Sequence, residues 1–271
     1  MLCTSRFRLL LVVIAALVLA GCGKAAPPGG HLGTITVAGS TSVQPLSEVL
    51  SQRFMELNPG VRINVQGGGS TAGVKAARER AADIGQSSRE LKPEEKGLHE
   101  TVIARDAIAI IVHPSNPVRE LTSAQVQAIF AGRLASWKDV GGPDRAIVLV
   151  NREAGSGTLG VFVELVMGKD QLSDRAIVQN STGAVRTTVS TTRDAVGYVS
   201  LAGLTPEVKA VAIDGVSPTI DNVLAGKYVV SRPFIYLTPQ APEGLVKAYI
   251  DFVLSAEGQA MVRKEGLVPV R

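Results

Sequence analysis

Short apolar runs of strand length alternate with longer amphipathic stretches along most of this chain. Such alternation predicts an α/β fold, in which mostly parallel strands are covered by helices. The predicted strands span residues 34–38, 61–66, 82–85, 107–114, 146–150, 176–179, 196–201 and 232–239. The predicted helices span residues 43–57, 72–80, a stretch after Gly157, 184–191 and two segments after Pro242.

Two of the apolar runs, residues 107–114 and 232–239, end in proline and bracket a middle section that repeats the alternation. If the C-terminal helices pack back on the first section, the chain crosses twice between two α/β lobes. We therefore predict lobe 1 from residues 34–110 plus 234–271 and lobe 2 from residues 111–233, with a ligand cleft between them. The other interpretation, in which both runs are ordinary buried strands of one large sheet, stays open on periodicity alone.

The N-terminal segment has the pattern of a secretory signal peptide. Arg6 and Arg8 precede an unbroken apolar stretch from Leu9 to Ala20. This stretch is shorter than the roughly 20 residues that a transmembrane helix needs. We therefore predict a signal peptide over residues 1–21 rather than a membrane span.

The stretch Leu19-Ala20-Gly21-Cys22 resembles a bacterial lipobox. This resemblance implies cleavage before Cys22 and lipidation of that residue, with residues 22–33 forming the lipidated cysteine and a flexible tether. Ordinary cleavage that leaves a free cysteine is the alternative. We expect a chain that is secreted across the plasma membrane and lipid-anchored, in the periplasm or at the outer face of the cell membrane.

The mature chain carries nearly balanced charge and few aromatic residues. Removing Arg6 and Arg8 from the 28 basic residues leaves 26 against 24 acidic ones, a net charge of +2. Only 4% of the residues are aromatic. Nucleic-acid binding, which needs a basic surface and stacking platforms, therefore has no support.

Cysteine and histidine usage limits the possible chemistry further. Cys3 leaves with the signal peptide, so Cys22 has no partner for an intrachain disulfide. His31, His99 and His113 are too few and too scattered for a metal site. We expect neither a metal nor a cofactor.

Three turns rich in small hydroxyl residues each lie between a predicted strand and a predicted helix. They span residues 38–45, 67–75 and 152–160. Such turns present free backbone N–H groups, the positive end of a helix dipole and Ser or Thr donors, which together suit an anion. For any single turn, a simple helix N-cap by Ser40, Ser70 or Ser156 is the preferred interpretation. The glycines that accompany the second and third turns favour a ligand, because they allow close approach of the backbone.

The third turn also matches two enzyme patterns formally, and both fail on context. Gly155, Gly157 and Gly160 fit G-x-G-x-x-G, but four residues separate the preceding strand from the glycines, and no acidic residue ends the next strand. No Gly-Lys-Ser/Thr follows, which excludes a P-loop. A serine-hydrolase turn needs glycine where Ala154 stands and a histidine after Ser156, and neither is present.

Six stretches of the sequence together resemble one known family. They are "AGSTSVQP" (38–45), "GGGSTAGVKA" (67–76), "ADIGQSSREL" (82–91), "IFAGRLASWKDVGG" (129–142), "NREAGSGTLGVF" (151–162) and "AVGYVSL" (195–201). In this order they resemble the phosphate-binding proteins of bacterial ABC-type phosphate uptake systems, over nearly all of the mature chain. The resemblance implies a type II periplasmic-binding-protein fold that holds one inorganic phosphate between its lobes. It also implies delivery to an ABC permease, and we expect a monomer.

Carried over residue by residue, the resemblance assigns a phosphate site. Its members are Thr41 and Ser42 in the first turn, Ser70 in the second, Ser156, Gly157 and Thr158 in the third, Arg152 as the main cation and Asp83 as a buried carboxylate. The guanidinium fork of arginine suits bidentate binding of a tetrahedral oxyanion. Ser87 and Ser88 are plausible extra donors, and Glu153 stands beside Arg152, where it would orient the guanidinium.

Asp83 carries the expected selectivity. Hydrogen phosphate can donate a hydrogen bond to a carboxylate, whereas sulfate at neutral pH cannot and would leave the buried charge unsatisfied. We therefore expect that Asp83→Asn weakens phosphate binding and relatively favours sulfate. The alternative, that Asp83 caps a strand end or pairs with Arg89, stays open.

Three other functions are compatible with the sequence. The nearest is a receptor for another tetrahedral oxyanion such as sulfate, molybdate or arsenate. A secreted serine hydrolase or phosphatase would need a metal or an activated nucleophile, and the sequence shows neither. An anchored sensor or adhesin without a transport role is the third.

Overall fold

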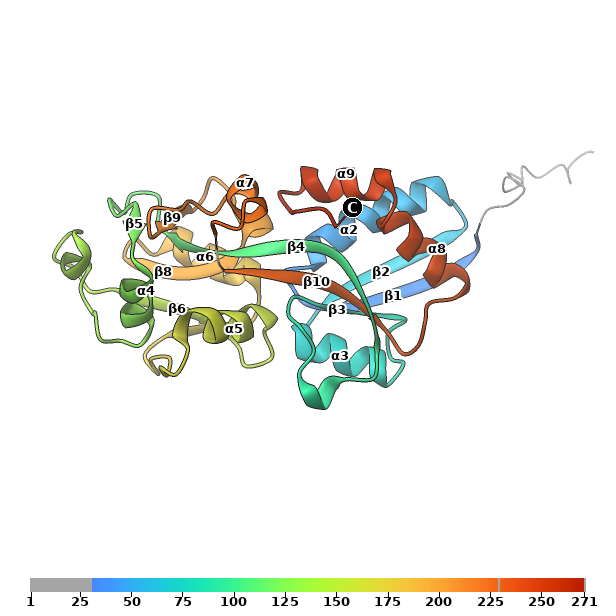
Figure 1. Cartoon of the computed structure of the whole chain (residues 1–271), viewed down its shortest axis with the longest axis horizontal. Coiled ribbons are helices and arrows are strands. Elements are labelled where there is room, and N and C mark those ends of the chain that lie inside the picture. Colours follow the sequence, from blue (N-terminus) through green and yellow to red (C-terminus); the bar gives the residue numbers. More distant parts are fainter. Residues whose placement is uncertain (1–30, 229, 271) are drawn as a thin grey trace, which may run out of the picture.

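A computed structural model describes residues 31–228 and 230–270. The predicted signal peptide, Cys22 and most of the predicted tether lie outside the described residues. The described chain forms two groups of strands and helices that lie side by side and are joined by two long strands (Figure 1). The predicted α/β class with two lobes and two crossovers is confirmed.

All of the predicted strands and helices are present, several with shifted ends. The strands are β1 (Gly33–Gly39), β2 (Val61–Gly67), β3 (Ile84–Ser87), β4 (His99–Val112), β5 (Glu120–Leu121), β6 (Val148–Arg152), β7 (Ile177–Gln179), β8 (Ala195–Ser200), β9 (Lys209–Ile213) and β10 (Ser231–Thr238). The α-helices are α2 (Gln44–Leu57), α3 (Ser70–Arg78), α4 (Ser123–Phe130), α5 (Gly157–Phe162), α6 (Thr182–Thr191), α7 (Ile220–Leu224), α8 (Gly244–Val253) and α9 (Ala256–Lys264). A π-helical turn (Val163–Met167) follows α5, and 3-10 turns occur at Pro93–Glu95, Trp137–Val140 and Leu201–Gly203.

Eight of the strands follow one hydrogen-bonded path, β2-β1-β3-β10-β4-β8-β6-β7, and β9 branches from β4 and pairs with β5. Pairing is parallel within each end of the path, as in β1 with β2 and β3, and in β6 with β7 and β8. The crossover strands β4 and β10 pair antiparallel with each other in the middle. One sheet path therefore runs through both lobes, as the alternative interpretation expected for the crossover strands.

The side chains nevertheless form separate cores at the two ends of this path. Here "first lobe" means β1–β3, α2, α3, α8 and α9, and "second lobe" means β5–β9 and α4–α7. Strand β4 contributes Ile103 to the core of the first lobe, and Ile108 and Ile110 to that of the second. Within β10 and the segment before it, Phe234 packs in the first core and Tyr228 in the second. The exact lobe boundaries stay predictions.

This topology brings the hydroxyl-rich turns together. In parallel strands followed by helices, the carboxyl ends lie at one edge of the sheet, and ligands bind outside that edge. The turns after β1 and β2 lie at the carboxyl edge of the first lobe, and the turn after β6 lies at that of the second. Figure 1 shows these edges facing each other across the middle of the molecule.

Within residues 31–228 and 230–270, none of the helices combines the length and the apolar character that a bilayer crossing requires.

Helix α3 packs on the backbone of the first-lobe sheet through glycines. A Cβ added at Gly73 would lie 2.5 Å from the carbonyl oxygen of Gln86 and 2.9 Å from Cα of Gly39. Because the atoms on both sides of this contact belong to the backbone, they cannot make room for an added methyl group by rotating a side chain. The contact holds Ser70, at the start of α3, close to the carboxyl edge of the sheet.

We expect Gly73→Ala to destabilise the protein by about 1–3 kcal/mol, because the added methyl group overpacks a backbone contact. Denaturant unfolding of both variants in parallel measures the effect. Gly68→Ala is the matched control: its Cβ would meet only Cβ of Ala72, at an ordinary 3.4 Å. Equal stability of the two variants would contradict this account of α3.

Candidate functional site

The site lies between the lobes and consists mainly of hydroxyl groups. We use "hydroxyl cluster" for Ser40, Thr41, Ser42, Ser70 and Ser88 of the first lobe with Thr158 and Thr182 of the second. Except for the half-buried Thr41, each of these residues is at most 5% exposed. The cluster is thus a polar site that is shielded from water.

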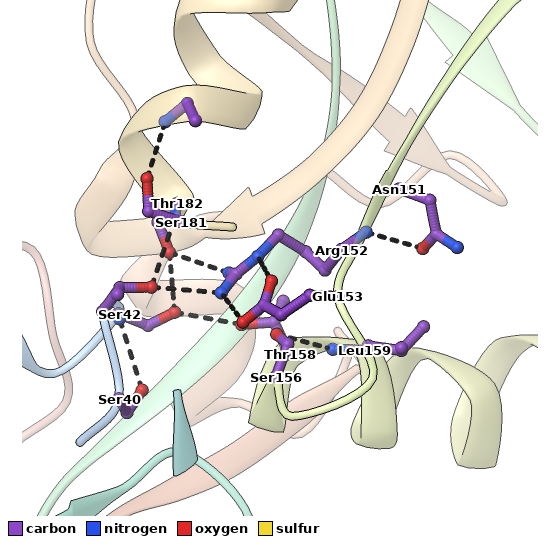
Figure 2. A network of polar contacts seen from close by, with 12 residues as sticks. Ser40, Ser42, Asn151, Arg152, Glu153, Ser156, Thr158, Leu159, Ser181 and Thr182 are labelled. Carbon is purple, nitrogen blue, oxygen red and sulfur yellow. Dashed lines mark hydrogen bonds and ion pairs between the residues drawn. The ribbon is translucent and has the colours of Figure 1, made fainter. Parts of the chain in front are cut away.

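Serine and threonine side chains connect the two lobes directly (Figure 2). The Ser42 hydroxyl lies 3.0 Å from that of Thr158 and 2.9 Å from that of Thr182. On the first-lobe side, Ser40 donates to Ser88 at 2.9 Å, and Ser88 lies 3.4 Å from Ser70. Hydroxyl groups both donate and accept, so these contacts can be exchanged for contacts to another oxygen-bearing group.

The simple N-cap interpretation holds for one turn of the three. Ser156 caps α5, because its hydroxyl accepts a hydrogen bond from the N–H of Leu159. The N-cap positions of α2 and α3 are Val43 and Gly69, and neither makes a side-chain cap. Ser40, Ser42 and Ser70 are therefore left for other contacts.

Arg152 ends strand β6 and lies beside the cluster with its side chain 2% exposed. Its guanidinium donates through Nε and Nη2 to the two carboxylate oxygens of Glu153, at 2.8 and 2.9 Å. The remaining donors reach Thr182 Oγ1 at 3.3 Å and Thr41 Oγ1 at 3.1 Å. Glu153 therefore orients the guanidinium toward the hydroxyl groups, as Figure 2 shows.

A second arginine reaches the cluster from the crossover strands. Arg232 of β10 donates through Nη1 to Thr158 Oγ1 at 2.8 Å and to Ser88 Oγ at 3.3 Å. Its Nε donates to Asp106 of β4 at 2.9 Å, and the two side chains are 1% and 0% exposed. Burial raises the pKa of the Asp106 carboxyl, and the charge of Arg232 opposes that rise.

The structure brings the residues that were assigned from the sequence close together, with one exception. Thr41, Ser42, Ser70, Arg152, Gly157 and Thr158 gather at the site, and Ser156 lies next to them in α5. Ser88, expected only as an extra donor, is at the centre of the first-lobe contacts.

The exception is Asp83, and the expectation of a buried carboxylate there is wrong. Strand β3 begins at Ile84, so Asp83 precedes the strand at its amino end, opposite the edge that bears the cluster. The side chain is exposed, and its Oδ2 accepts from the N–H of Thr36 at 2.8 Å. Of the two alternatives, the strand-end role is the one observed, because Arg89 pairs with Glu95 instead.

Two residues of the site were not predicted. Thr182 begins α6 after the hydroxyl-rich stretch "QNST" (179–182), a fourth strand-to-helix turn that the same reasoning could have found. Arg232 has a weaker signal, a single charge before an apolar run. The role of Arg232 in the site depends on its ion pair with Asp106. Asp106 lies in a distant segment of the sequence, and no sequence pattern links the two residues.

No group of three or more histidine, cysteine, aspartate or glutamate side chains within residues 31–228 and 230–270 could hold a metal ion.

Two lobes with a buried polar site between them are the arrangement in which solute-binding proteins close around a ligand. The family model of the PBP superfamily domain matches residues 24–257. The phosphate-binding protein PstS of Bacillus subtilis is 33% identical over 88% of this chain and 81% of its own length. The chain therefore belongs to the PBP superfamily and, within it, to the family of the phosphate-binding proteins PstS.

Solved structures agree with this assignment. A protein of Clostridium perfringens, described as a phosphate ABC transporter substrate-binding protein and solved with bound phosphate, is 40% identical with a TM-score of 0.85. That comparison covers 88% of this chain and all of the other chain (100%). An ABC-type phosphate transport receptor from Vibrio cholerae is 35% identical with a TM-score of 0.71, over 86% and 99% of the two chains. The predicted type II periplasmic-binding-protein fold is confirmed.

A substitution at Gly157 tests whether the close contact between the two lobes requires a glycine at this position. A Cβ at this position would clash with Ser70 Oγ and lie 2.7 Å from Ser88 Oγ, both across the lobe boundary. We expect Gly157→Ala to hold the lobes apart while each lobe stays folded. Small-angle scattering should then give a larger radius of gyration than for the unmodified protein.

Gly155→Ala, in the same turn, is the matched control, because its Cβ would meet only Cβ of Thr71, at 3.9 Å. An unchanged radius of gyration for Gly157→Ala would show that the turn can yield without opening the lobes.

Proposed function

We propose that this chain captures one inorganic phosphate between its two lobes and delivers it to an ABC permease. One observation carries the proposal: hydroxyl-bearing turns from both lobes converge on the buried guanidinium of Arg152. The relatives from Bacillus subtilis, Clostridium perfringens and Vibrio cholerae support it, since each is named for phosphate.

The chemistry of the cluster suits a tetrahedral oxyanion. Hydroxyl donors from several directions can contact separate oxygens, and an arginine fork adds charge-assisted hydrogen bonds. The proposed phosphate contacts are Thr41, Ser42, Ser70, Ser156, Gly157, Thr158 and Arg152. The first N–H groups of α5 lack acceptors within the helix, so Gly157 and Thr158 can also contribute backbone donors.

Binding and closure are coupled in this arrangement. A ligand that contacts Ser42 and Thr158 at once binds both lobes, and so it stabilises the arrangement in which they touch. Release to a permease requires the lobes to separate again. The two crossover strands, β4 and β10, are where such a motion would be accommodated.

We propose that the protein binds phosphate without catalysing a reaction. The hydroxyl of Ser156 accepts from a backbone N–H, and His113 is hydrogen-bonded to Ser115. In the described part of the chain, no histidine hydrogen-bonds to a hydroxyl of the cluster. Turnover of a generic phosphoester by the purified protein would contradict this view.

Arg152→Gln should weaken phosphate binding about 10- to 100-fold, the effect of losing hydrogen bonds to a charged group. Asp83→Asn should leave both phosphate affinity and the phosphate-to-sulfate ratio unchanged, because the carboxylate lies at the far end of β3. Isothermal titration of the phosphate-stripped chain without residues 1–22 measures both variants.

The same titrations separate the other oxyanions. One-to-one phosphate binding that sulfate, molybdate and arsenate cannot match supports the proposal. Equal or tighter binding of one of these anions would instead make the protein a receptor for that anion. Hydroxyl groups can donate as well as accept, so we expect weaker rejection of sulfate than a dedicated carboxylate would give.

We also propose an extracytoplasmic location with a lipid anchor at Cys22, on the basis of the N-terminal sequence pattern. In a bacterial host, Cys22→Ala should abolish labelling by an alkyne-tagged fatty acid and release the protein from the membrane fraction. Cys3→Ala is the matched control and should keep both. Labelling that survives Cys22→Ala would exclude this anchor.

A further inference from the structure

The crossover strands hold a buried ion pair at the point where they pass between the lobes. Arg232 of β10 and Asp106 of β4 are direct cross-strand neighbours. Asp106 also accepts from the N–H of Leu201, at the end of β8. The Asp106 carboxylate is therefore positioned by contacts that involve β4, β10 and the end of β8. In turn, it positions the guanidinium of Arg232.

Arg232 uses only part of its donor capacity on Asp106. Both Nε and Nη2 lie 2.9 Å from the same carboxylate oxygen, but only Nε has hydrogen-bond geometry. Nη2 has no acceptor among the described residues, although the side chain is 1% exposed. Nη2 therefore contributes to the ion pair with Asp106 through its charge, and Nη1 is the nitrogen left for contacts outside the pair.

The other end of the guanidinium faces the hydroxyl cluster. Nη1 donates to Thr158 of the second lobe and to Ser88 of the first. Thr158 in turn contacts Ser42, whose hydroxyl also contacts Thr182, a partner of Arg152. The two arginines therefore reach one connected set of hydroxyl groups from two different strands.

A purely structural role explains this arrangement poorly. Burying an arginine and a carboxylate is costly, and apolar residues of similar volume often stabilise a core as well or better. A structural ion pair also needs no donors outside the pair. Here Nη1, which makes no contact with Asp106, donates to Thr158, which is itself a proposed phosphate contact.

We propose that Arg232 is a second cationic contact for the bound phosphate and that Asp106 is its positioning residue. This inference rests on the proposed function and adds a residue that the sequence motifs did not include. Each arginine has its own carboxylate, Glu153 or Asp106, so the site holds two positive and two negative charges. Phosphate is then recognised by directed hydrogen bonds from two guanidinium forks rather than by excess positive charge.

The test compares phosphate titrations of the mature chain, residues 23–271, with those of the paired variant Asp106→Asn/Arg232→Gln. The paired change leaves no uncompensated buried charge. We expect phosphate to bind about 10- to 100-fold more weakly, with sulfate titrated in parallel. Arg232→Lys keeps the charge but loses the fork, and it should also lose affinity, which covers the case of a poorly folded paired variant.

Arg89→Gln/Glu95→Gln is the matched control. Arg89 and Glu95 form another deeply buried arginine–carboxylate pair, with side chains 7% and 10% exposed and 2.6 Å between Nη1 and Oε2. Arg89 donates to Glu95, to a backbone carbonyl and to Thr71, and to no member of the hydroxyl cluster. We expect this control to lose thermal stability but to keep phosphate affinity within about threefold.

The positioning role of Asp106 is tested by a measurement that a folding defect would not change, the pH dependence of phosphate affinity. Asp106→Asn leaves Arg232 without its counter-charge, so the ratio of phosphate affinity at pH 8 to that at pH 6 should rise as dianionic phosphate is favoured. Among the described residues, Arg152, Tyr198 and Tyr228 are the other ionisable groups that interact with the pair. Burial raises the pKa of both tyrosines, so neither titrates in this range. An unchanged ratio would overturn the positioning role.

The outcomes distinguish this inference from the proposed function. If the unmodified chain binds phosphate and the paired variant binds it less than tenfold more weakly, Arg232 is not a ligand contact and the proposed function stands. A comparable loss in the Arg89 control would also overturn the inference. If the unmodified chain does not bind phosphate, the proposed function fails and this inference fails with it.

Discussion

Burial of charge is the constraint on which this site depends. Arginine cannot be taken out of water without a partner, and both arginines here lie next to carboxylates that are held by their own segments. Glu153 follows Arg152 directly in sequence, whereas Asp106 comes from another strand. The first pair can form wherever the turn after β6 forms. The second can form only when β4 and β10 are already side by side.

The hydroxyl groups work under the same constraint. Each serine or threonine of the cluster is buried or half-buried and needs a partner, and it finds one on the opposite lobe or on a neighbouring turn. A cluster of small, rotatable donors and acceptors can keep its hydrogen bonds in more than one arrangement. It therefore suits a site that must exist both with and without a ligand, while the apolar cores on either side stay unchanged.

Much of this could be predicted from the sequence because the signals are local. Strand β1 and helix α2 follow from an apolar run and an amphipathic run, and three of the turns follow from their glycine and hydroxyl content. The failures involve the matching of one family position and distant pairing. Asp83 was assigned from the resemblance, yet it precedes β3 at the amino end of the strand, whereas Ser88 follows the carboxyl end and lies at the centre of the first-lobe contacts. The significance of Arg232 depends on Asp106, 126 positions away.

The position of β10 has a consequence for how the molecule is made. This strand lies between β3 and β4 in the sheet, and α8 and α9, which follow it, complete the core of the first lobe. Strand β10 and helices α8 and α9 are synthesised after every element of the second lobe. The first lobe therefore cannot close its sheet until these elements have been made, whereas the elements β5–β9 of the second lobe are contiguous and complete earlier. A chain truncated before β10 would carry Arg152 and all seven residues of the hydroxyl cluster and still lack the strand that supplies Arg232 to them.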